Sequence, residues 1–265
     1  MSQWATDAEL EQYRAEGYFL RERAFSPGEL EPLRDAVEAV HQRIVCAARE
    51  ADAPPEEWVD DKRYQDLLGS SVKWEWRAGA AEIRSMEPYH HLDARLDALI
   101  DDPRLWAPCA AVIGVRSVSL FSDKLNFKRS GGAPFPWHQD TPYWAFGCDH
   151  LDRLASVLVY LDAATRENGC LWVIPGSHRR GRIPCFEDRG TLGRLYTDPD
   201  ALDVACAVAL EADAGSVVFF HGDLVHGSRS NRTQRDRRAL VLTYQPAELP
   251  RWQHDDIRSV EATTQ

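Results

Sequence analysis

The sequence predicts a mainly β protein, a jelly roll with helices packed on its outside. Two observations favour this fold class. Helix caps and amphipathic spacing concentrate before Gly114, whereas the rest of the chain consists of short apolar runs separated by Gly, Pro, Asn and Asp. We therefore expect a single domain over residues 1–265, with a mainly helical part and a lid over 1–115, a jelly-roll core over 116–246 and a tail over 247–265.

The first two helices are predicted by their N-terminal caps. Thr6 and Glu9 have the spacing of a capping box, which opens a helix that should end near Gly17. Ser26 and Glu29 repeat this spacing ahead of an apolar stripe at every third or fourth position. The stripe predicts a long amphipathic helix whose buried face consists of Leu30, Leu33, Val37, Val40 and Ile44.

The segment 51–80 shows neither helical nor strand periodicity. Acidic residues are mixed there with aromatic ones, and Pro54-Pro55 and the run Gly69-Ser70-Ser71 interrupt any pattern. We expect a loop or lid with short helical pieces, followed by helical segments around 92–100 and 103–113. The aromatic residues of this lid are Trp58, Tyr64, Trp74 and Trp76.

Beyond Gly114, short apolar runs have the length and spacing of strands in an antiparallel sandwich or barrel. They read VRSVSLFSDKLNF, ASVLVYLD, GCLWVIPG, GSVVFFHGDLVHGS and RALVLTYQP. Strand alternation places Val118, Leu120 and Ser122 on one side of the first run. In the second run, one side carries Val157, Val159 and Leu161.

Composition excludes several classes of partner. The net charge is −11 with a pI near 5.3, and the basic residues form no stripe, which argues against nucleic acid and anionic membranes. No apolar run approaches the roughly 18 residues of a membrane span. The six cysteines form no C-x-x-C pair and the N-terminus does not resemble a signal peptide, so we expect reduced thiols, a cytoplasmic location and a small-molecule partner.

A histidine and an aspartate stand two positions apart five times, so the spacing alone decides nothing. On a strand, residues i and i+2 face the same side and can share a metal ion. The pairs at His91, His150 and His254 fall in expected helix, loop or tail, where solvated or capping roles are typical. The pairs His138/Asp140 and His221/Asp223 remain as candidates.

His138 and Asp140 open the strand region, and a late strand of a jelly roll can bring His226 beside them. Two histidines and one carboxylate leave open positions on a metal, which suits iron(II), whereas zinc is more often closed at four ligands. A site built from His221, Asp223 and His226 would require the chain to turn within HGDLVHG. Leu224-Val225 instead predict that the strand continues outward.

In order along the chain, the motifs resemble the phytanoyl-CoA dioxygenase family of Fe(II)- and 2-oxoglutarate-dependent oxygenases. The resemblance extends from about Leu10 to about Pro246 and rests on HQD at 138–140, NGCL at 168–171, PGSH at 175–178, HGS at 226–228 and Arg237. It implies a double-stranded β-helix that uses Fe(II), 2-oxoglutarate and dioxygen. It also implies that the iron ligands are His138, Asp140 and His226.

The same resemblance assigns the co-substrate site. Arg237 stands eleven residues after His226, where the family's arginine holds the distal carboxylate of 2-oxoglutarate, and a guanidinium can form two parallel bonds to that group. A hairpin around SNRTQRD would bring Ser228 beside Arg237, while strand alternation turns Arg238 away. Relatives place polar groups near the co-substrate at the positions matched by Asn126 and Lys128.

The reaction and the substrate are less constrained. The family's halogenating relatives have a small residue in place of Asp140, so its carboxylate favours hydroxylation, desaturation or oxidative ring closure. The segments 51–80 and 179–205 are expected to cover the mouth of the barrel, with Trp144, Trp74 and Trp76 lining the substrate pocket. Tryptophans among acids suggest a hydrophilic small molecule, such as a glycosylated or aminoglycoside-like natural product; acyl-CoA and amino-acid derivatives are alternatives.

Two further classes of protein compete with this interpretation. A non-catalytic cupin-like binding protein could keep the sandwich without turnover, although the full set of three ligands, arginine and serine argues against it. A zinc hydrolase could use the same triad, but it would not need Arg237. The oligomeric state is left open.

Overall fold

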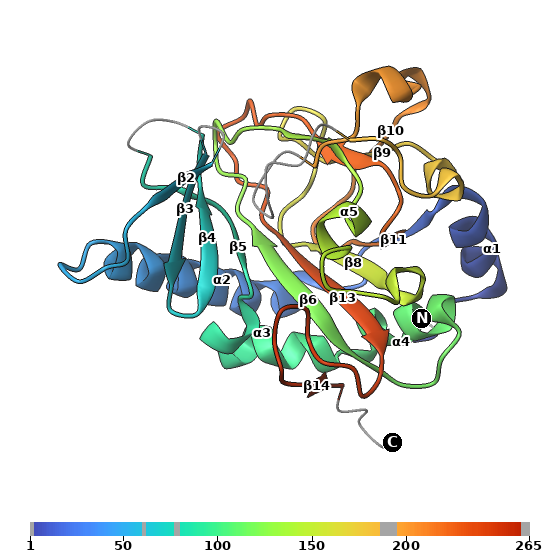
Figure 1. Ribbon diagram of the computed structural model, residues 1–265, viewed down its shortest axis with the longest axis horizontal. Helices are drawn as coiled ribbons and strands as arrows, with labels where there is room; N and C mark the ends of the chain where they lie inside the picture. Colours follow the sequence, from blue (N-terminus) through green and yellow to red (C-terminus); the bar gives the residue numbers. More distant parts are fainter. Residues whose placement is uncertain (1–2, 60–61, 77–79, 186–194, 261–265) are drawn as a thin grey trace.

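The computed structural model describes residues 3–59, 62–76, 80–185 and 195–260, and it shows a double-stranded β-helix with helices packed on one side (Figure 1). The larger sheet runs in the order β1 (Tyr18–Arg21), β11 (Val217–His221), β8 (Ala155–Tyr160), β13 (Ala239–Pro246), β6 (Val118–Asn126), β5 (Ile83–Glu87), β4 (Ser70–Trp74), β3 (Lys62–Leu67) and β2 (Glu57–Val59). β14 (Arg258–Ser259) adds to β6. The smaller sheet runs β10 (Val208–Leu210), β9 (Leu171–Val173), β12 (His226–Ser228) and β7 (Phe135–His138).

The predicted helices form where their caps indicate. Thr6 and Glu9 make the reciprocal bonds of a capping box at α1 (Asp7–Glu16), which ends at Gly17 in the left-handed conformation. α2 (Pro27–Ala48) buries all five residues of the predicted stripe. The remaining helices are α3 (Ala94–Ala98), α4 (Pro103–Ile113), α5 (Thr141–Trp144) and the short 3-10 turns η1 (His90–Leu92), η2 (Leu99–Asp101), η3 (Leu151–Arg153), η4 (Ser177–Arg180), η5 (Pro199–Ala201) and η6 (Val204–Cys206). In the described part of the chain, no helix combines the length and apolarity that a membrane span needs.

The expected strand runs become β6, β8, β9, the pair β11 and β12, and β13. The larger sheet buries one face against the helices, where α2 packs over strand residues such as Val157, Val159 and Leu240. Its other face meets the smaller sheet through a second apolar cluster that includes Leu158, Tyr160 and Trp172. Alternate residues of β8 therefore serve two different cores, which explains why its burial is continuous.

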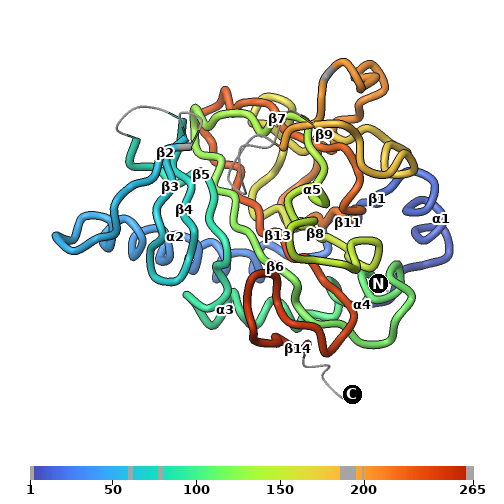
Figure 2. Tube along the Cα trace, viewed as in Figure 1, coloured from blue at the N-terminus to red at the C-terminus, as the bar shows by residue number. Residues whose placement is uncertain are grey.

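The prediction of short helical pieces in the lid is wrong. The described residues 57–59 and 62–74 form the antiparallel strands β2, β3 and β4, which extend the larger sheet beyond β5, side by side in Figure 2. Burial alternates along β4, and Leu68 and Gly69 make the turn between β3 and β4 with positive φ. The stretch before Gly114 is therefore less helical than expected, because β1 to β5 all lie within it.

A β-bulge in β6 corrects the predicted facing of its side chains. The register against β13 shifts between Leu120 and Ser122, which leaves Phe121 as the extra residue. Val118 and Leu120 therefore point into the helix-covered core, whereas Ser122 lines a cavity on the opposite face. Because the bulge inverts the alternation, Lys124 also lines this cavity, two residues further along the same face.

Candidate functional site

Three potential metal ligands meet between the two sheets. His138 ends β7 and pairs with His226 of the adjacent strand β12. Asp140 Oδ1 lies 3.9 Å from His138 Nε2 and 3.8 Å from His226 Nε2. Within the described residues, this is the one cluster of at least three histidine, cysteine or acidic residues whose ligand atoms could hold a metal; they lie within 4.8 Å of one another.

Asp140 reaches the site in a way that strand alternation did not predict. The strand ends at His138, and Asp140 has helical φ and ψ as the cap of α5. Its backbone N–H donates to Gly222 O, which fixes the turn. Gln139 is fully buried between the pair, and its side chain binds the backbone at Gly181, Asp223 and Ile183. The middle residue of HQD thus anchors the loops around the site.

Both histidines are held in the tautomer that a metal needs. His138 Nδ1 donates to Pro136 O at 2.8 Å, and His226 Nδ1 donates to Leu224 O at 2.9 Å. Each bond places the proton on Nδ1 and leaves the Nε2 lone pair facing Asp140. Burial and the neighbouring His226 lower the pKa of His138, which favours the neutral, ligating form of its ring.

The rival pair does not join this cluster. The chain does turn after His221, since Leu224 N–H donates to His221 O, so the expectation of a continuing strand was wrong. His221 Nδ1 nevertheless accepts a bond from Asp223 N–H, and its ring lies 5.4 Å from that of His178. The structure therefore gives His221 contacts away from His226.

A small cavity of about 70 Å³ adjoins the three ligands and contains unpaired polar atoms. Arg237, Ser228 and Asn126 all line it. Arg237 Nε, Ser228 Oγ and Asn126 Oδ1 are buried and have no hydrogen-bond partner. Buried polar atoms are rarely left unpaired, so a polar molecule in this cavity would supply the missing bonds.

Arg237 and Ser228 meet across the barrel and not in the predicted hairpin. Ser228 lies on β12 of the smaller sheet, whereas Arg237 precedes β13 of the larger sheet. Arg237 is 3 % exposed, and its Nη2 donates to Gly169 O at 2.6 Å. Arg238 points away from the cavity, as predicted, and binds Asp162 and Glu38.

Lys128 lies behind the small cavity. It does not line either cavity, its Nζ donates to Ala133 O at 2.9 Å, and its backbone oxygen accepts a bond from Arg237 N–H. Burial and the charges of Arg237 and Arg84 lower the pKa of Lys128 to about 5. The structure therefore places Lys128 outside the small cavity that Arg237 lines, with its backbone oxygen bonded to Arg237.

A larger cavity of about 250 Å³ opens beside His138 and Asp140. Trp74, Trp76 and Trp144 line it together with Tyr64, whereas Trp58 is exposed and does not. None of the acidic residues described within 51–80 lines this cavity. Part of the predicted second cover, 186–194, lies outside the described residues, but Tyr196 lines the cavity and its backbone bridges to that of His138.

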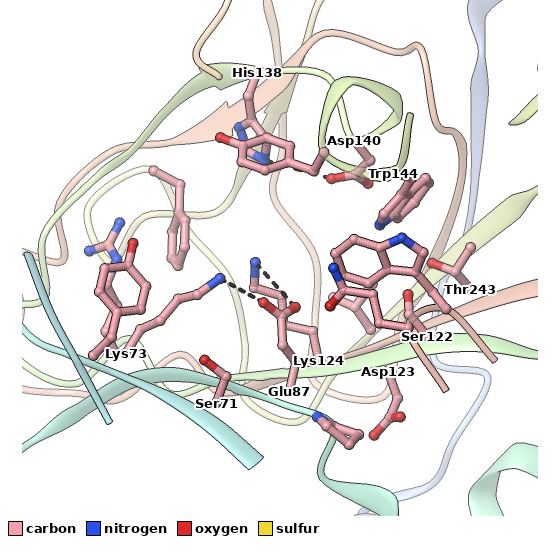
Figure 3. A pocket seen from close by; sticks show the side chains of 18 of the residues that line it. Ser71, Lys73, Glu87, Ser122, Asp123, Lys124, His138, Asp140, Trp144 and Thr243 are labelled. Carbon is pink, nitrogen blue, oxygen red and sulfur yellow. Dashed lines mark hydrogen bonds and ion pairs between the residues drawn. The ribbon is translucent and has the colours of Figure 1, made fainter. Parts of the chain in front are cut away.

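Sequence reasoning missed the charged residues of the larger cavity, among them a cluster of three. Figure 3 shows Lys73, Glu87 and Lys124 facing one another on the side opposite His138 and Asp140. Lys124 shares a face of β6 with Asn126, so the predicted role of Asn126 could have drawn attention to it. Lys73 and Glu87 come from β4 and β5, which the sequence did not identify as strands.

The double-stranded β-helix, the facial cluster of two histidines and a carboxylate, and the buried arginine beside it define a class of protein, the Fe(II)/2-oxoglutarate-dependent dioxygenases. The chain belongs to the phytanoyl-CoA dioxygenase family, whose profile matches residues 13–239. It is an enzyme that uses Fe(II), 2-oxoglutarate and dioxygen.

Curated relatives cover most of the chain. A methylphosphonate hydroxylase of Gimesia maris is 29% identical over 92% of this chain and 82% of its own length. An ectoine dioxygenase of Bordetella parapertussis is 27% identical over 91% of this chain and 75% of its own. Among solved structures, EctD from S. alaskensis with 2-oxoglutarate and 5-hydroxyectoine is 25% identical, with a TM-score of 0.71 over 97% of this chain and 86% of that one.

Proposed function

We propose that His138, Asp140 and His226 hold the iron of this dioxygenase, and that Arg237 and Ser228 bind the distal carboxylate of 2-oxoglutarate with Asn126 on the same cavity wall. The observation that carries the proposal is the set of three buried, unpaired polar atoms on one small cavity beside the three ligand side chains. The donor set fits iron(II), because two neutral imidazoles and one carboxylate leave positions for co-substrate and dioxygen.

Each group of the chain has a defined task in this site. The Nδ1 bonds orient both imidazoles, so the metal meets lone pairs that already point toward it. Arg237 supplies a fixed charge and two donors to a carboxylate, and the bonds to Gly169 O and Lys128 O hold its position. Bound iron with 2-oxoglutarate supplies the oxidising power, while the aromatic walls of the larger cavity position the substrate and exclude water.

The larger cavity is the proposed substrate site. Its volume of about 250 Å³ suits a small molecule. The reaction is hydroxylation, desaturation or oxidative ring closure of a hydrophilic molecule, and we place it in natural-product biosynthesis in the cytoplasm. Relatives named for methylphosphonate, L-proline and ectoine support a small polar substrate.

An acyl-CoA substrate remains an alternative, because a phytanoyl-CoA dioxygenase of Arabidopsis thaliana is 25% identical over 95% of this chain. Such a substrate would have to place most of its length outside the larger cavity. The expected acidic lining, which suggested an aminoglycoside-like substrate, is absent among the described residues of 51–80. A small polar substrate and an acyl-CoA substrate therefore differ in size and in charge, and binding of either kind of molecule to the protein can be measured.

The test is the stoichiometry of the co-substrate. Purified protein is incubated with 2-oxoglutarate and dioxygen in the presence of Fe(II), of Zn(II) or of no metal, and the succinate formed per 2-oxoglutarate consumed is measured. We expect equimolar succinate with Fe(II) alone, and mass spectrometry of candidate substrates to show a gain of one oxygen or a loss of two hydrogens. Turnover that is equal with Zn(II) would contradict the proposal.

A further inference from the structure

The wall of the larger cavity carries a half-buried cluster of one carboxylate and two ammonium groups. Lys73, Glu87 and Lys124 come from the adjacent strands β4, β5 and β6. Lys73 Nζ lies 2.6 Å from Glu87 Oε1, and Lys124 Nζ lies 3.9 Å from Glu87 Oε2. Burial alone would raise the pKa of Glu87, but the two lysines lower it to about 2, so the carboxylate is ionised. A single negative charge therefore faces two ammonium groups.

The arginines of this cavity already have partners elsewhere. Arg63 lies 3.3 Å from Glu56, Arg84 lies 3.8 Å from Glu75, and Arg251 forms a bidentate pair with Asp256. None of these three carboxylates lines the cavity. The cluster around Glu87 differs from these pairs, because both lysines depend on one acid and Lys124 makes only a long contact with it.

The other carboxylates on the cavity do not complete the cluster. Asp123 accepts bonds from the backbone N–H groups of Tyr89 and His90 and from the His90 ring. Asp140 faces His138 and His226, where the proposed iron binds. A positive charge is thus left near Lys124, and burial together with Lys73 lowers the pKa of Lys124, as expected for a cation without its own counter-ion.

We propose that Lys73 and Lys124, oriented by Glu87, bind an oxyanion of the substrate, a carboxylate or a phosphonate. The inference rests on the proposed site, and it defines the substrate as a small molecule with one anionic end. Figure 3 shows the cluster across the cavity from His138 and Asp140, so an anchored anion would leave the rest of the molecule between the cluster and the metal. Trp74, Trp144 and Tyr64 also line this cavity.

The test uses probes that share one aromatic body and differ in charge. Protein loaded with Mn(II) and 2-oxoglutarate is titrated calorimetrically with benzoate, phenylphosphonate and benzamide. At least one anion should bind about tenfold more tightly than benzamide, because a charge-assisted contact to an oxyanion is stronger than a contact to a neutral amide. The preference between benzoate and phenylphosphonate identifies the kind of oxyanion. Equal affinities for all three probes would overturn the inference.

Variants separate this cluster from the co-substrate site. Lys73→Met should remove most of the preference for the anion while changing 2-oxoglutarate affinity less than about twofold. Lys124 also lines the small cavity, so Lys124→Met should weaken both ligands, with the larger loss for the anion. Glu87→Gln should strengthen anion binding, because it removes the competing negative charge. Arg129→Met is the matched control for net charge; its guanidinium pairs with Glu38 and Asp236 away from both cavities, and anion affinity should stay unchanged.

Two outcomes distinguish the inference from the function on which it rests. If Lys124→Met weakens 2-oxoglutarate as much as it weakens the anion, Lys124 belongs to the co-substrate site and the inference is wrong, while the proposed function stands. If the wild-type protein binds neither Mn(II) nor 2-oxoglutarate, the proposed function itself fails. Retained 2-oxoglutarate affinity in a variant also shows that the variant is folded.

Discussion

Single hydrogen bonds decide which atoms of the site are available for chemistry. His138 and His226 each donate a hydrogen bond from Nδ1 to a backbone carbonyl two residues earlier in the chain. The acceptor of each bond is a backbone oxygen two residues before the histidine, so the same short stretch of chain supplies both the ligand and the group that orients its ring. His221 lacks such an arrangement, because its Nδ1 accepts a hydrogen bond from Asp223 N–H.

The first prediction concerns these histidines. His138→Ala and His226→Ala should each abolish the weak visible absorption band that the anaerobic protein develops with Fe(II) and 2-oxoglutarate, because two remaining ligands bind iron poorly. His221→Ala is the matched control and should retain the band with lower thermal stability. Absorption titrations check this, and an unchanged band in both ligand variants would place the metal elsewhere.

The second prediction concerns the neighbouring arginines. Arg237→Ala should weaken 2-oxoglutarate at least about tenfold, since a charge-assisted bond contributes about 1.5–3 kcal/mol, and should change Fe(II) affinity little. Arg238→Ala should leave 2-oxoglutarate affinity intact and lower the free energy of unfolding instead, because it removes one of the two arginines that pair with each of Asp162 and Glu38. Calorimetric titration and chemical denaturation measure the two effects, and equal losses of 2-oxoglutarate affinity would contradict the assigned facing.

At the scale of elements, turns and bulges connect the sheets to the site. The bulge at Phe121 rotates the second half of β6 so that Ser122, Lys124 and Asn126 face the cavities. Gly169 lies in the turn before β9 at φ +81°, and its carbonyl oxygen accepts the bond from Arg237. These local irregularities place polar side chains on the walls of the cavities. Regular strand alternation would instead bury the same side chains in the core or expose them to solvent.

The third prediction follows from Gly169. A Cβ at this position would collide with Arg229 O and Lys128 Cε, in addition to the strain of a positive φ. Gly169→Ala should therefore destabilise the protein by about 1–3 kcal/mol more than a strain-only substitution and should raise the KM for 2-oxoglutarate. Chemical denaturation and steady-state kinetics measure the two changes.

Gly131→Ala is the matched control for that experiment. Gly131 has φ +73°, but a Cβ there would meet nothing within 4 Å. The control should lose only about 1–2 kcal/mol from backbone strain and should keep the KM of the wild type. Equal stability losses in both variants would show that the close approach at Gly169 is relieved at little cost.

At the scale of the whole molecule, burial of the Lys128 amine makes stability depend on pH. The folded protein lowers the pKa of Lys128 to about 5, whereas an unfolded lysine titrates near 10.5. Between these two values the unfolded chain binds one more proton than the folded chain. Stability must therefore rise with pH through this window, because raising the pH removes the proton that favours unfolding.

The fourth prediction tests this linkage. Lys128→Met should be more stable than the wild type near pH 6, and the gain should shrink or reverse by pH 9, where the loss of the bond to Ala133 O dominates. Denaturation at several pH values measures the difference. Arg129→Met removes a cation that stays charged throughout and should shift stability equally at each pH. If the free energy of unfolding depends on pH in the same way for Lys128→Met and the wild type, the assignment of a buried, neutral Lys128 is contradicted.

The sequence by itself determined the helices, the core strands and the residues of the proposed iron site. Capping boxes and apolar periodicity act within a few residues, so α1, α2, β8 and β13 could be predicted from local pattern. The ordered motifs then identified His138, Asp140, His226 and Arg237 through the resemblance to the family. These are features whose information lies in contiguous stretches of the chain.

Only the tertiary structure decided which faces those elements present to one another. The strands β2 to β4 exist because they pair outward from β5, and the bulge in β6 is defined only by its register with β13. Lys73, Glu87 and Lys124 meet for the same reason, since three strands must align before their charges share a cavity. Strand pairing depends on partners far away in sequence, so local pattern could not specify the part of the pocket where we expect the substrate to bind.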